Sequence, residues 1–485
     1  MIMETVSAQN RKTIIEKMAK MRDVVESFCN KESFPFIVVA VAFLFHLFAL
    51  DLVGIITFAL LATVAVLFFK DCKSGLAIVM STVFIVSIKN GPGYSTGEDY
   101  YSKKEILIPI LCVGALLVIA MGIRCIRNRK NFKASKMFLS TVVLAISFVL
   151  AGAGSKYYSE SVWFGVLMGL SYIGIYFAFT GCMGSRENLL DYISTVLTAL
   201  CLLIAIQVVE VYAKHLISGG TFDSRWKDKI VFGWGVSNIA GEMIVFFIPF
   251  VFYKIEHSKK FYNVYHAIAL FCITMLVFTL NRAGLLFGIP MFAVLWIRLL
   301  IKTPHKNSIL LTVVVYFSFA LVVLISLTAF TEINKVFMYF REIIENLGDE
   351  GISMSRRDQL WAQAWGFFKK SPILGEGYAS SFHAPISNSH ANLFQTLTHN
   401  FIMQTVGSGG IVGVSAMIFY LLNAIKLSLK KYEGKFHIIC FGILYFCISL
   451  FDTTYFITYS VMILMLIIAM AEKFVAKGEN DNGKN

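Results

Sequence analysis

Residues 399–413 read HNFIMQTVGSGGIVG and mark the boundary between two very different parts of the chain. The segment before them, 331–399, is the longest polar stretch, and residues 400–425 form a strongly apolar run. An apolar run of about 20 residues is long enough to cross a bilayer as a helix. We therefore expect a long loop to enter a membrane here, and its function depends on which side of the membrane it lies.

The composition of the whole chain indicates a membrane protein. Of its 485 residues, 57% are hydrophobic and only 15% are charged, whereas a soluble domain carries about 25% charged residues. Apolar runs recur from residue 34 to residue 472. We predict an all-α, polytopic integral membrane protein with about 12 to 14 transmembrane helices and one long external loop.

The basic residues follow the membrane topology and form no nucleic-acid surface. The chain has 43 Lys and Arg against 30 Asp and Glu, but these basic residues flank apolar runs, so we expect no nucleic-acid partner. The nine cysteines include no CxxC pair and favour neither a disulfide framework nor a zinc site. No small-residue cleavage site follows a short apolar core near the N-terminus, so no cleaved signal peptide is expected.

Cytoplasmic loops are enriched in Lys and Arg, and this rule orients the chain. It predicts cytoplasmic termini and a long external loop. The expected parts are a cytoplasmic N-terminal segment that forms a surface helix (1–33), transmembrane helices (34–330), the external loop (331–399), C-terminal transmembrane helices (400–472) and a cytoplasmic tail (473–485). A few basic residues fall on the external side against the rule: Lys103, Lys104, Arg225, Lys227 and Lys229.

The external loop is far longer than an ordinary connection, and loops of that length are usually functional or disordered. Residues 332–346 and 357–370 both have amphipathic helical spacing, and Ser371 and Pro372 end the second helix. A glycine turn follows at residues 372–378. We expect the two short helices to lie on the outer surface as a lid.

Basic side chains gather on the external face at Arg282, at Arg356 and Arg357, and at His399. A guanidinium group stays charged and grips phosphate oxygens through a fixed fork of donors. A histidine beside it can take a proton from a sugar hydroxyl. This combination suits displacement at a sugar carbon that bears a lipid diphosphate as leaving group.

Each of these residues also has a structural interpretation. Arg282, at a helix end, could anchor the chain to lipid phosphate. One of Arg356 and Arg357 could face solvent or pair with Asp358. A histidine at a membrane boundary is often structural, which would also apply to His399, and the neighbouring His383 and His390 compete with it for a catalytic role.

Glu242 and the glycines of the opening stretch raise separate questions. Glu242 lies well inside an apolar run, where an ionisable residue is either functional or hydrogen-bonded to a neighbouring helix. Both interpretations stay open. Gly407, Gly409, Gly410 and Gly413 are assigned to close backbone packing.

The order and spacing of these motifs resemble the bacterial O-antigen ligase and polymerase superfamily. His399 and Asn400, followed by nine residues, Gly410, two residues and Gly413, resemble its signature. Arg357, then Trp361, then the run SPILGEG at 371–377, is similar to the family's external-loop segment. The Asn-Arg pair at 281–282 resembles its Ser-Arg step, and the run GWGVSN that ends at Asn238 is also similar.

The resemblance implies a membrane glycosyltransferase of the all-helical, GT-C-like type in the bacterial cytoplasmic membrane, with its active site external. It implies an undecaprenyl-diphosphate-linked glycan as donor, a glycan or glycolipid as acceptor, and no metal ion or other cofactor. Carried over by position, the arginines that hold the donor are Arg282 and Arg357, and the base is His399. Further substrate-binding residues are expected among these: Arg356, Asn400, Trp361 and Asn238.

Three alternatives remain open on the sequence. A ligase and a polymerase differ only in the acceptor, which one sequence does not identify. A transporter or flippase of lipid-linked glycans would also need external arginines, but it should carry charges through several spans. A non-enzymatic scaffold would tolerate substitution of Arg357 or His399.

Overall fold

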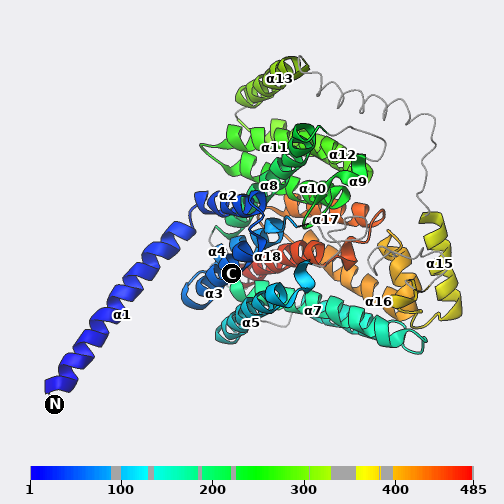
Figure 1. Cartoon of the computed structure of the whole chain (residues 1–485), viewed down its shortest axis with the longest axis horizontal. Helices are drawn as coiled ribbons and strands as arrows, with labels where there is room; N and C mark the ends of the chain where they lie inside the picture. The colour runs from blue at the N-terminus through cyan, green and yellow to red at the C-terminus, as the bar shows by residue number, and fades with distance from the viewer. Residues whose placement is uncertain are drawn as a thin grey trace.

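The protein is almost entirely helical, as predicted (Figure 1). The computed structural model describes residues 2–88, 100–128, 136–183, 188–219, 226–304, 306–328, 357–381, 383 and 397–482. In this part of the chain the strands form one two-residue hairpin, β1 (Val231–Phe232) with β2 (Gly235–Val236). The all-α polytopic fold class is therefore confirmed.

The helices follow the apolar runs closely. In chain order the α-helices are α1 (Ile2–Cys29), α2 (Ser33–Leu47), α3 (Asp51–Phe68), α4 (Lys73–Thr82), α5 (Lys104–Arg127), α6 (Lys136–Leu150), α7 (Tyr158–Cys182), α8 (Leu189–Ile217), α9 (Trp226–Lys229), α10 (Ser237–His257), α11 (Tyr262–Phe278), α12 (Arg282–Lys302), α13 (Lys306–Thr328), α15 (Arg357–Lys370), α16 (Phe401–Leu429), α17 (Lys435–Ser449) and α18 (Thr458–Asn482). Short 3₁₀ turns lie at η1 (Val83–Ile85), η2 (Tyr100–Ser102), η4 (Ala379–Ser381) and η6 (Thr454–Phe456).

Eight of the described helices are long and apolar enough to cross a membrane, and a bent pair formed by α1 and α2 makes up to nine. Five shorter apolar helices occur among the same residues. The predicted 12 to 14 spans are reached only if these shorter helices also cross. Because a bilayer core is about 30 Å thick, a helix of 15 residues needs a thinned membrane or a break at its end.

Two helices form the centre of the bundle. Along the most apolar windows of α8 and α10, 83% and 89% of the residues are buried, whereas in α5 only 11% are. A lipid-facing helix keeps its apolar side chains on the outside, because lipid tails are as apolar as a protein core. The helices α2, α11, α12 and α17 pack around this pair.

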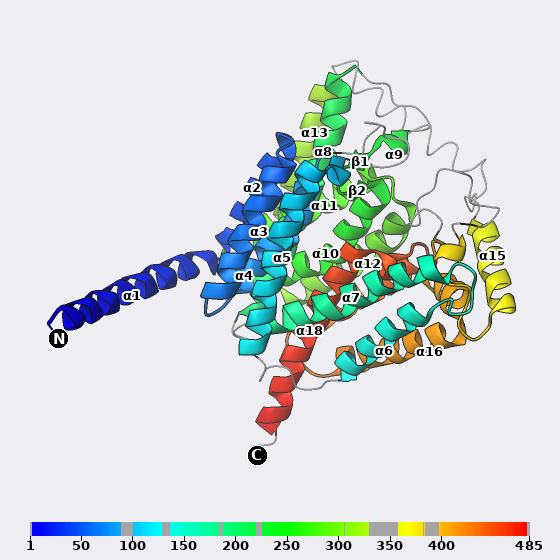
Figure 2. The same cartoon turned by 60° about the horizontal axis from the view of Figure 1, so that its bottom comes forward.

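The external loop is described in part. The predicted helix 357–370 is confirmed as α15, with the same bounds, and it packs along α16 (Figures 1 and 2). The predicted helix at 332–346 lies outside the described residues. The lid of two helices on the outer surface therefore stays a prediction.

Candidate active site

The candidate site is built around the first turn of α16. Asn400 is the N-cap of this helix, and its Oδ1 accepts hydrogen bonds from the backbone N–H groups of Ile402 (2.9 Å) and Met403 (3.0 Å). Its Nδ2 donates to the carbonyl oxygen of Leu450 at 3.0 Å. An asparagine at this position satisfies N–H groups that the helix leaves unpaired. Asn400 thereby fixes where the helix begins and ties it to the loop after α17.

His399 precedes the cap with a φ of +50°, in the left-handed region. Residues other than glycine adopt this conformation rarely, and they do so mostly at functional or tightly held sites. The turn is held on its other side through Thr398, whose carbonyl oxygen accepts from Trp361 Nε1 at 3.0 Å. The backbone N–H of Thr398 donates to Gln404 Oε1 at 2.8 Å. His399 is therefore presented by a fixed backbone.

The glycines of the signature and the glycine turn of the loop form one structural unit. Gly410 has a φ of +59° and a ψ of −154°, which breaks the helical hydrogen-bonding pattern inside α16. The groups released at the break pair with the loop: Ile411 N–H donates to Pro372 O (2.9 Å), and Gly377 N–H donates to Ser408 O (3.0 Å). The turn at residues 371–377 therefore packs into the break in the helix.

Only glycine fits at two of these positions. A Cβ on Gly410 would lie 2.6 Å from Gly375 N and from Ile373 O. A Cβ on Gly375, where φ is +65°, would lie 2.3 Å from the carbonyl group of Ser408. These distances are too short for any side chain, so the motif encodes the close approach of two backbones. The structure supports the assignment to close packing for Gly410 and for Gly407, where a Cβ would lie 2.9 Å from Ala364. It does not support it for Gly409, where a Cβ would meet nothing within 4 Å, or for Gly413, where a Cβ would lie 3.5 Å from Thr405.

Arg282 begins α12, one residue after a tight turn. Leu280 has a φ of +56°, and Asn281 caps the helix by accepting from the N–H of Gly284 at 3.0 Å. Asparagine and serine are equally good N-caps, which explains how Asn281 can stand where the family often has serine. Asn281 Nδ2 also donates to the carbonyl oxygen of Asn238 at 2.5 Å. The starts of α10 and α12 are thus fixed side by side.

His399 faces a carboxylate from another part of the chain. Its Nδ1 lies 3.3 Å from Oδ1 of Asp452, in the loop between α17 and η6. Burial alone would raise the pKa of Asp452, but the hydrogen bond and charge of His399, the N–H of Thr453 and the adjacent Glu242 hold this pKa below its usual range. The Asp452 carboxylate therefore stays charged and can orient the imidazole ring.

Glu242 lies beneath this pair in α10. Its side chain is buried, and its Oε2 has no hydrogen-bond partner among the described residues. The neighbouring charges are those of Asp452 and Arg357. A buried carboxyl group that lies beside Asp452 and has one oxygen without a partner among the described residues favours the functional interpretation of Glu242.

Three cationic side chains converge above this carboxylate pair. Burial lowers the pKa of Lys227, the charges of Arg282 and Arg357 lower it further, and Asp228 and Asp452 oppose the shift. The charges of Arg282 and Arg357 therefore lie close enough to Lys227 to interact with it electrostatically. None of the three has an ion-pair partner within the described ranges. Unpaired like charges held together are typical of an anion-binding site.

Lys227 is positioned by a small, well-packed element. It lies in α9, which is anchored by the buried Trp226. The indole ring of Trp226 packs against Tyr212 (5.1 Å between ring centroids) and His215 (4.1 Å) at the end of α8. The backbone of α9 is thus fixed to the central helix α8, although Lys227 itself is only half-buried.

Some of the predicted site residues lie close together in the structure, and others have a structural role. Arg282, Arg357 and His399 lie at the same end of the bundle. Trp361 and Asn400 support the backbone on either side of His399, so their role in substrate binding stays a prediction.

Four other predicted or competing residues are not assigned to this group. The predicted substrate-binding role of Asn238 also stays open, and its Oδ1 is buried without a partner among the described atoms. Arg356 and His390 lie outside the described residues. His383 is engaged elsewhere, stacked on Tyr157 at 4.0 Å and 2.7 Å from Glu160.

The sequence analysis did not select Lys227 or Asp452 for the site. The sequence did contain a sign of Lys227, since it is one of the few basic residues whose predicted position disagrees with the enrichment of Lys and Arg in cytoplasmic loops. Asp452 had a weaker one, an acidic residue between two apolar runs. Its pairing with His399 joins residues 53 positions apart, and no local pattern encodes that contact.

The comparison with protein families agrees with this geometry. Residues 267–418 match a family model described as O-antigen ligase. This part of the chain, less than half of its length, is therefore similar to the O-antigen ligase family. The match runs from α11 into α16 and includes Arg282, Arg357 and His399. A search of curated proteins found no match.

The similarity to the O-antigen ligase family and the eight candidate spans among the described residues both point to a multi-pass membrane protein. Three residues of the candidate site lie outside the matched region: Lys227, Glu242 and Asp452. Only the three-dimensional structure assigns these three residues to the candidate site.

Proposed function

We propose that this chain is a glycosyltransferase that moves a glycan from an undecaprenyl-diphosphate carrier to a hydroxyl group of a second glycan or glycolipid. The observation that supports the proposal most strongly is that three cations without an ion-pair partner among the described residues lie near a histidine–carboxylate pair at one end of the bundle. The proposed location is the outer face of a bacterial cytoplasmic membrane, with both termini cytoplasmic. This orientation rests on the Lys and Arg bias of the short loops.

In this proposal the cations hold the diphosphate of the donor. Arg282 and Arg357 each offer a planar fork of N–H donors that fits two phosphate oxygens, and Lys227 adds a point charge. As the bond between sugar and diphosphate breaks, negative charge grows on the leaving oxygen. Fixed positive groups stabilise that charge more in the transition state than in the bound donor, so they accelerate the reaction.

His399 acts as the general base. With Nδ1–H donating to Asp452, the free Nε2 can accept the proton of the acceptor hydroxyl. The oxygen then attacks the anomeric carbon while the carbon–oxygen bond to the diphosphate breaks, and undecaprenyl diphosphate leaves. Asp452 stabilises the imidazolium that forms. A single displacement inverts the configuration of that carbon, so retention in the product would contradict this mechanism.

The decisive experiment compares Arg357→Met and Arg282→Met with matched controls on the same helices. The purified protein is given an undecaprenyl-diphosphate oligosaccharide and an acceptor, and released undecaprenyl diphosphate is measured. We expect each arginine variant to lose about 10²- to 10³-fold in turnover, the size of effect found when one transition-state donor is removed.

The controls are Lys369→Met, at the exposed end of α15, and Lys302→Met, at the far end of α12. Both remove one positive charge from the same helix without touching the site, so turnover should stay within about twofold. Equal losses in the arginine and lysine variants would mean that net charge, and not the site, is responsible. Unchanged turnover in the arginine variants would favour the scaffold interpretation.

A further inference from the structure

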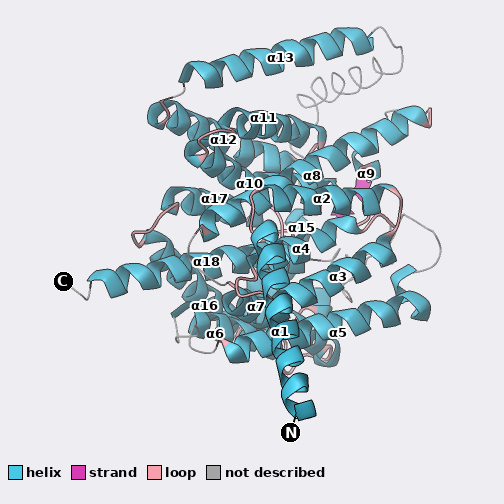
Figure 3. Cartoon of the chain, turned by 90° about the vertical axis from the view of Figure 1, so that its left-hand side faces the viewer, coloured by secondary structure: helices cyan, strands magenta, loops and turns pink. Residues whose placement is uncertain are grey.

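The N-terminal helix α1 stands apart from the bundle. It meets α2 at an angle of 81° and extends away from the other helices (Figures 1 and 2). In Figure 3, α1 runs across the direction of α2, α3 and α5. Because α3 and α5 are candidate spans, a helix that runs across their direction lies parallel to the membrane surface.

The described side chains of α1 form an apolar stripe. Met18, Met21, Val25 and Phe28 are spaced by three, four and three residues, which places them on one face of the helix. Their exposed fractions are 60%, 66%, 44% and 45%. So much apolar surface on a projecting helix needs a cover.

The attachment of α1 shows which way this stripe faces. Glu26 accepts hydrogen bonds from the N–H groups of Lys70 (3.0 Å) and Asp71 (2.7 Å), so a different face of α1 holds the connection between α3 and α4. Phe28, in the stripe, packs edge-on against Phe34 of α2, with ring centroids 6.0 Å apart. The stripe therefore faces the side on which α2 runs, which is the side of the bilayer.

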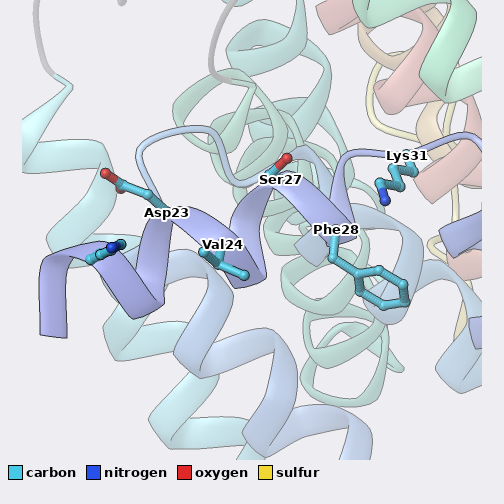
Figure 4. Close-up of a pocket in the computed structure, with 6 residues that line it drawn as sticks. Asp23, Val24, Ser27, Phe28 and Lys31 are labelled. Atoms are coloured by element: carbon cyan, nitrogen blue, oxygen red, sulfur yellow. The ribbon is translucent and has the colours of Figure 1, made fainter. Parts of the chain in front are cut away.

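Basic side chains border the stripe. Lys20, Ser27 and Lys31 line a shallow pocket together with Asp23, Val24 and Phe28 (Figure 4). Lys31 Nζ lies 5.9 Å from the centre of the Phe28 ring. Asp23 is already paired with Arg22 and Lys70. Lys20 and Lys31 have no acidic partner among the described residues, so the pocket has an excess of positive charge.

We propose that α1 lies in the headgroup layer of the cytoplasmic leaflet, with its apolar stripe in the lipid and with Lys20, Ser27 and Lys31 around the phosphate of an anionic phospholipid. The occupant follows from the combination of features. The apolar stripe fits the hydrocarbon layer of a membrane, and the bordering lysines fit its negatively charged headgroups. This inference does not depend on the proposed glycosyl transfer.

The experiment measures amide hydrogen exchange of residues 16–29 in the full-length protein, in nanodiscs of phosphatidylcholine with or without phosphatidylglycerol. We expect slower exchange with phosphatidylglycerol. The double variant Lys20→Glu and Lys31→Glu should lose most of that difference, since each lysine near an anionic surface contributes roughly fivefold in binding. The control is Lys259→Glu with Lys260→Glu, which has the same charge change on exposed residues outside α1.

Three results would overturn the proposal. Exchange that is equally fast in both lipids would show that the helix does not bind anionic lipid. Protection that rises with protein concentration, in either lipid, would show that a second copy of the chain covers the stripe. Protection by inorganic phosphate in neutral discs, equal to that by phosphatidylglycerol, would show that a free anion is the ligand. None of these readouts uses catalytic activity.

Discussion

The pairing of His399 with Asp452 gives the most specific prediction, for the variant Asp452→Asn. The substitution keeps the size of the side chain and removes its charge. Asn can still accept a hydrogen bond from His399 Nδ1, but it does not stabilise an imidazolium. The loss should therefore appear in the step where the acceptor proton moves, and it should lower kcat more than it raises KM.

The magnitude follows from the geometry of the pair. A hydrogen bond to a charged group contributes about 1.5–3 kcal/mol. At 3.3 Å the contact is long, which favours the lower end of that range, while the burial of Asp452 strengthens the effect of its charge. We therefore expect kcat to fall by about tenfold to a hundredfold. The control Asp358→Asn, on the exposed first turn of α15, should leave kcat unchanged.

The pH dependence of stability provides a second readout for the same variant. The pKa of Asp452 is held below its usual value of 3.8, so its carboxylate stabilises the fold above that pH, and the contribution is lost as pH falls through the lowered pKa. Asp452→Asn should be less stable than the parent protein at pH 7, and the difference should shrink as the pH falls below 3.8 and through the lowered pKa. A variant with kcat within twofold of the parent would refute the role of Asp452.

Three further predictions concern the surroundings of this pair. Gly410→Ala should destabilise the protein by about 2–4 kcal/mol in thermal unfolding, because its Cβ would meet backbone atoms at 2.6 Å. The control Gly409→Ala, whose Cβ would meet nothing within 4 Å, should cost less than about 1 kcal/mol. Equal effects of the two substitutions would contradict the close approach of the two backbones at Gly410. Asn400→Ala should lower the free energy of unfolding by about 1 kcal/mol, and Asn400→Ser should restore it, because serine also caps a helix. If the Asn400→Ser protein is stable but inactive, Asn400 contacts the substrate directly. Lys227→Met should raise the donor KM about tenfold, while Lys229→Met should not. Because burial and the arginines lower the pKa of Lys227, Lys227→Arg should retain donor binding at alkaline pH where the parent protein loses it. If donor binding falls at the same alkaline pH in both proteins, Lys227 is not in the site.

Much of the helical framework could be predicted because apolar runs and helices share their ends. The prediction for 357–370 has the same bounds as α15, since amphipathic spacing and Pro372 are local signals. The shorter helices were harder, because an apolar run of about 15 residues does not say whether it crosses the membrane. The two strands near Trp234 were not predicted, because hairpins this short have no alternating pattern.

The candidate site was partly predictable for a related reason. Arg282, Arg357 and His399 carry a local signal, a charged group at the end of an apolar run or inside a motif. The contact between His399 and Asp452, and the pairing of Gly410 with Gly375, depend on how distant segments pack. Lys227 is an exception to the topology rule: in the predicted orientation its positive charge is on the external side, and it lies near two arginines.

The most direct test of the proposed function is the turnover of a purified undecaprenyl-diphosphate oligosaccharide by the intact protein, with and without a chelator, beside His399→Ala and Arg357→Ala. We predict release of undecaprenyl diphosphate that survives the chelator and is lost in both variants. The mass of the glycan product then separates a polymerase from a ligase. If no carrier is released with any acceptor, while labelled donor crosses a vesicle membrane, the protein is a transporter and the proposed transfer chemistry is wrong.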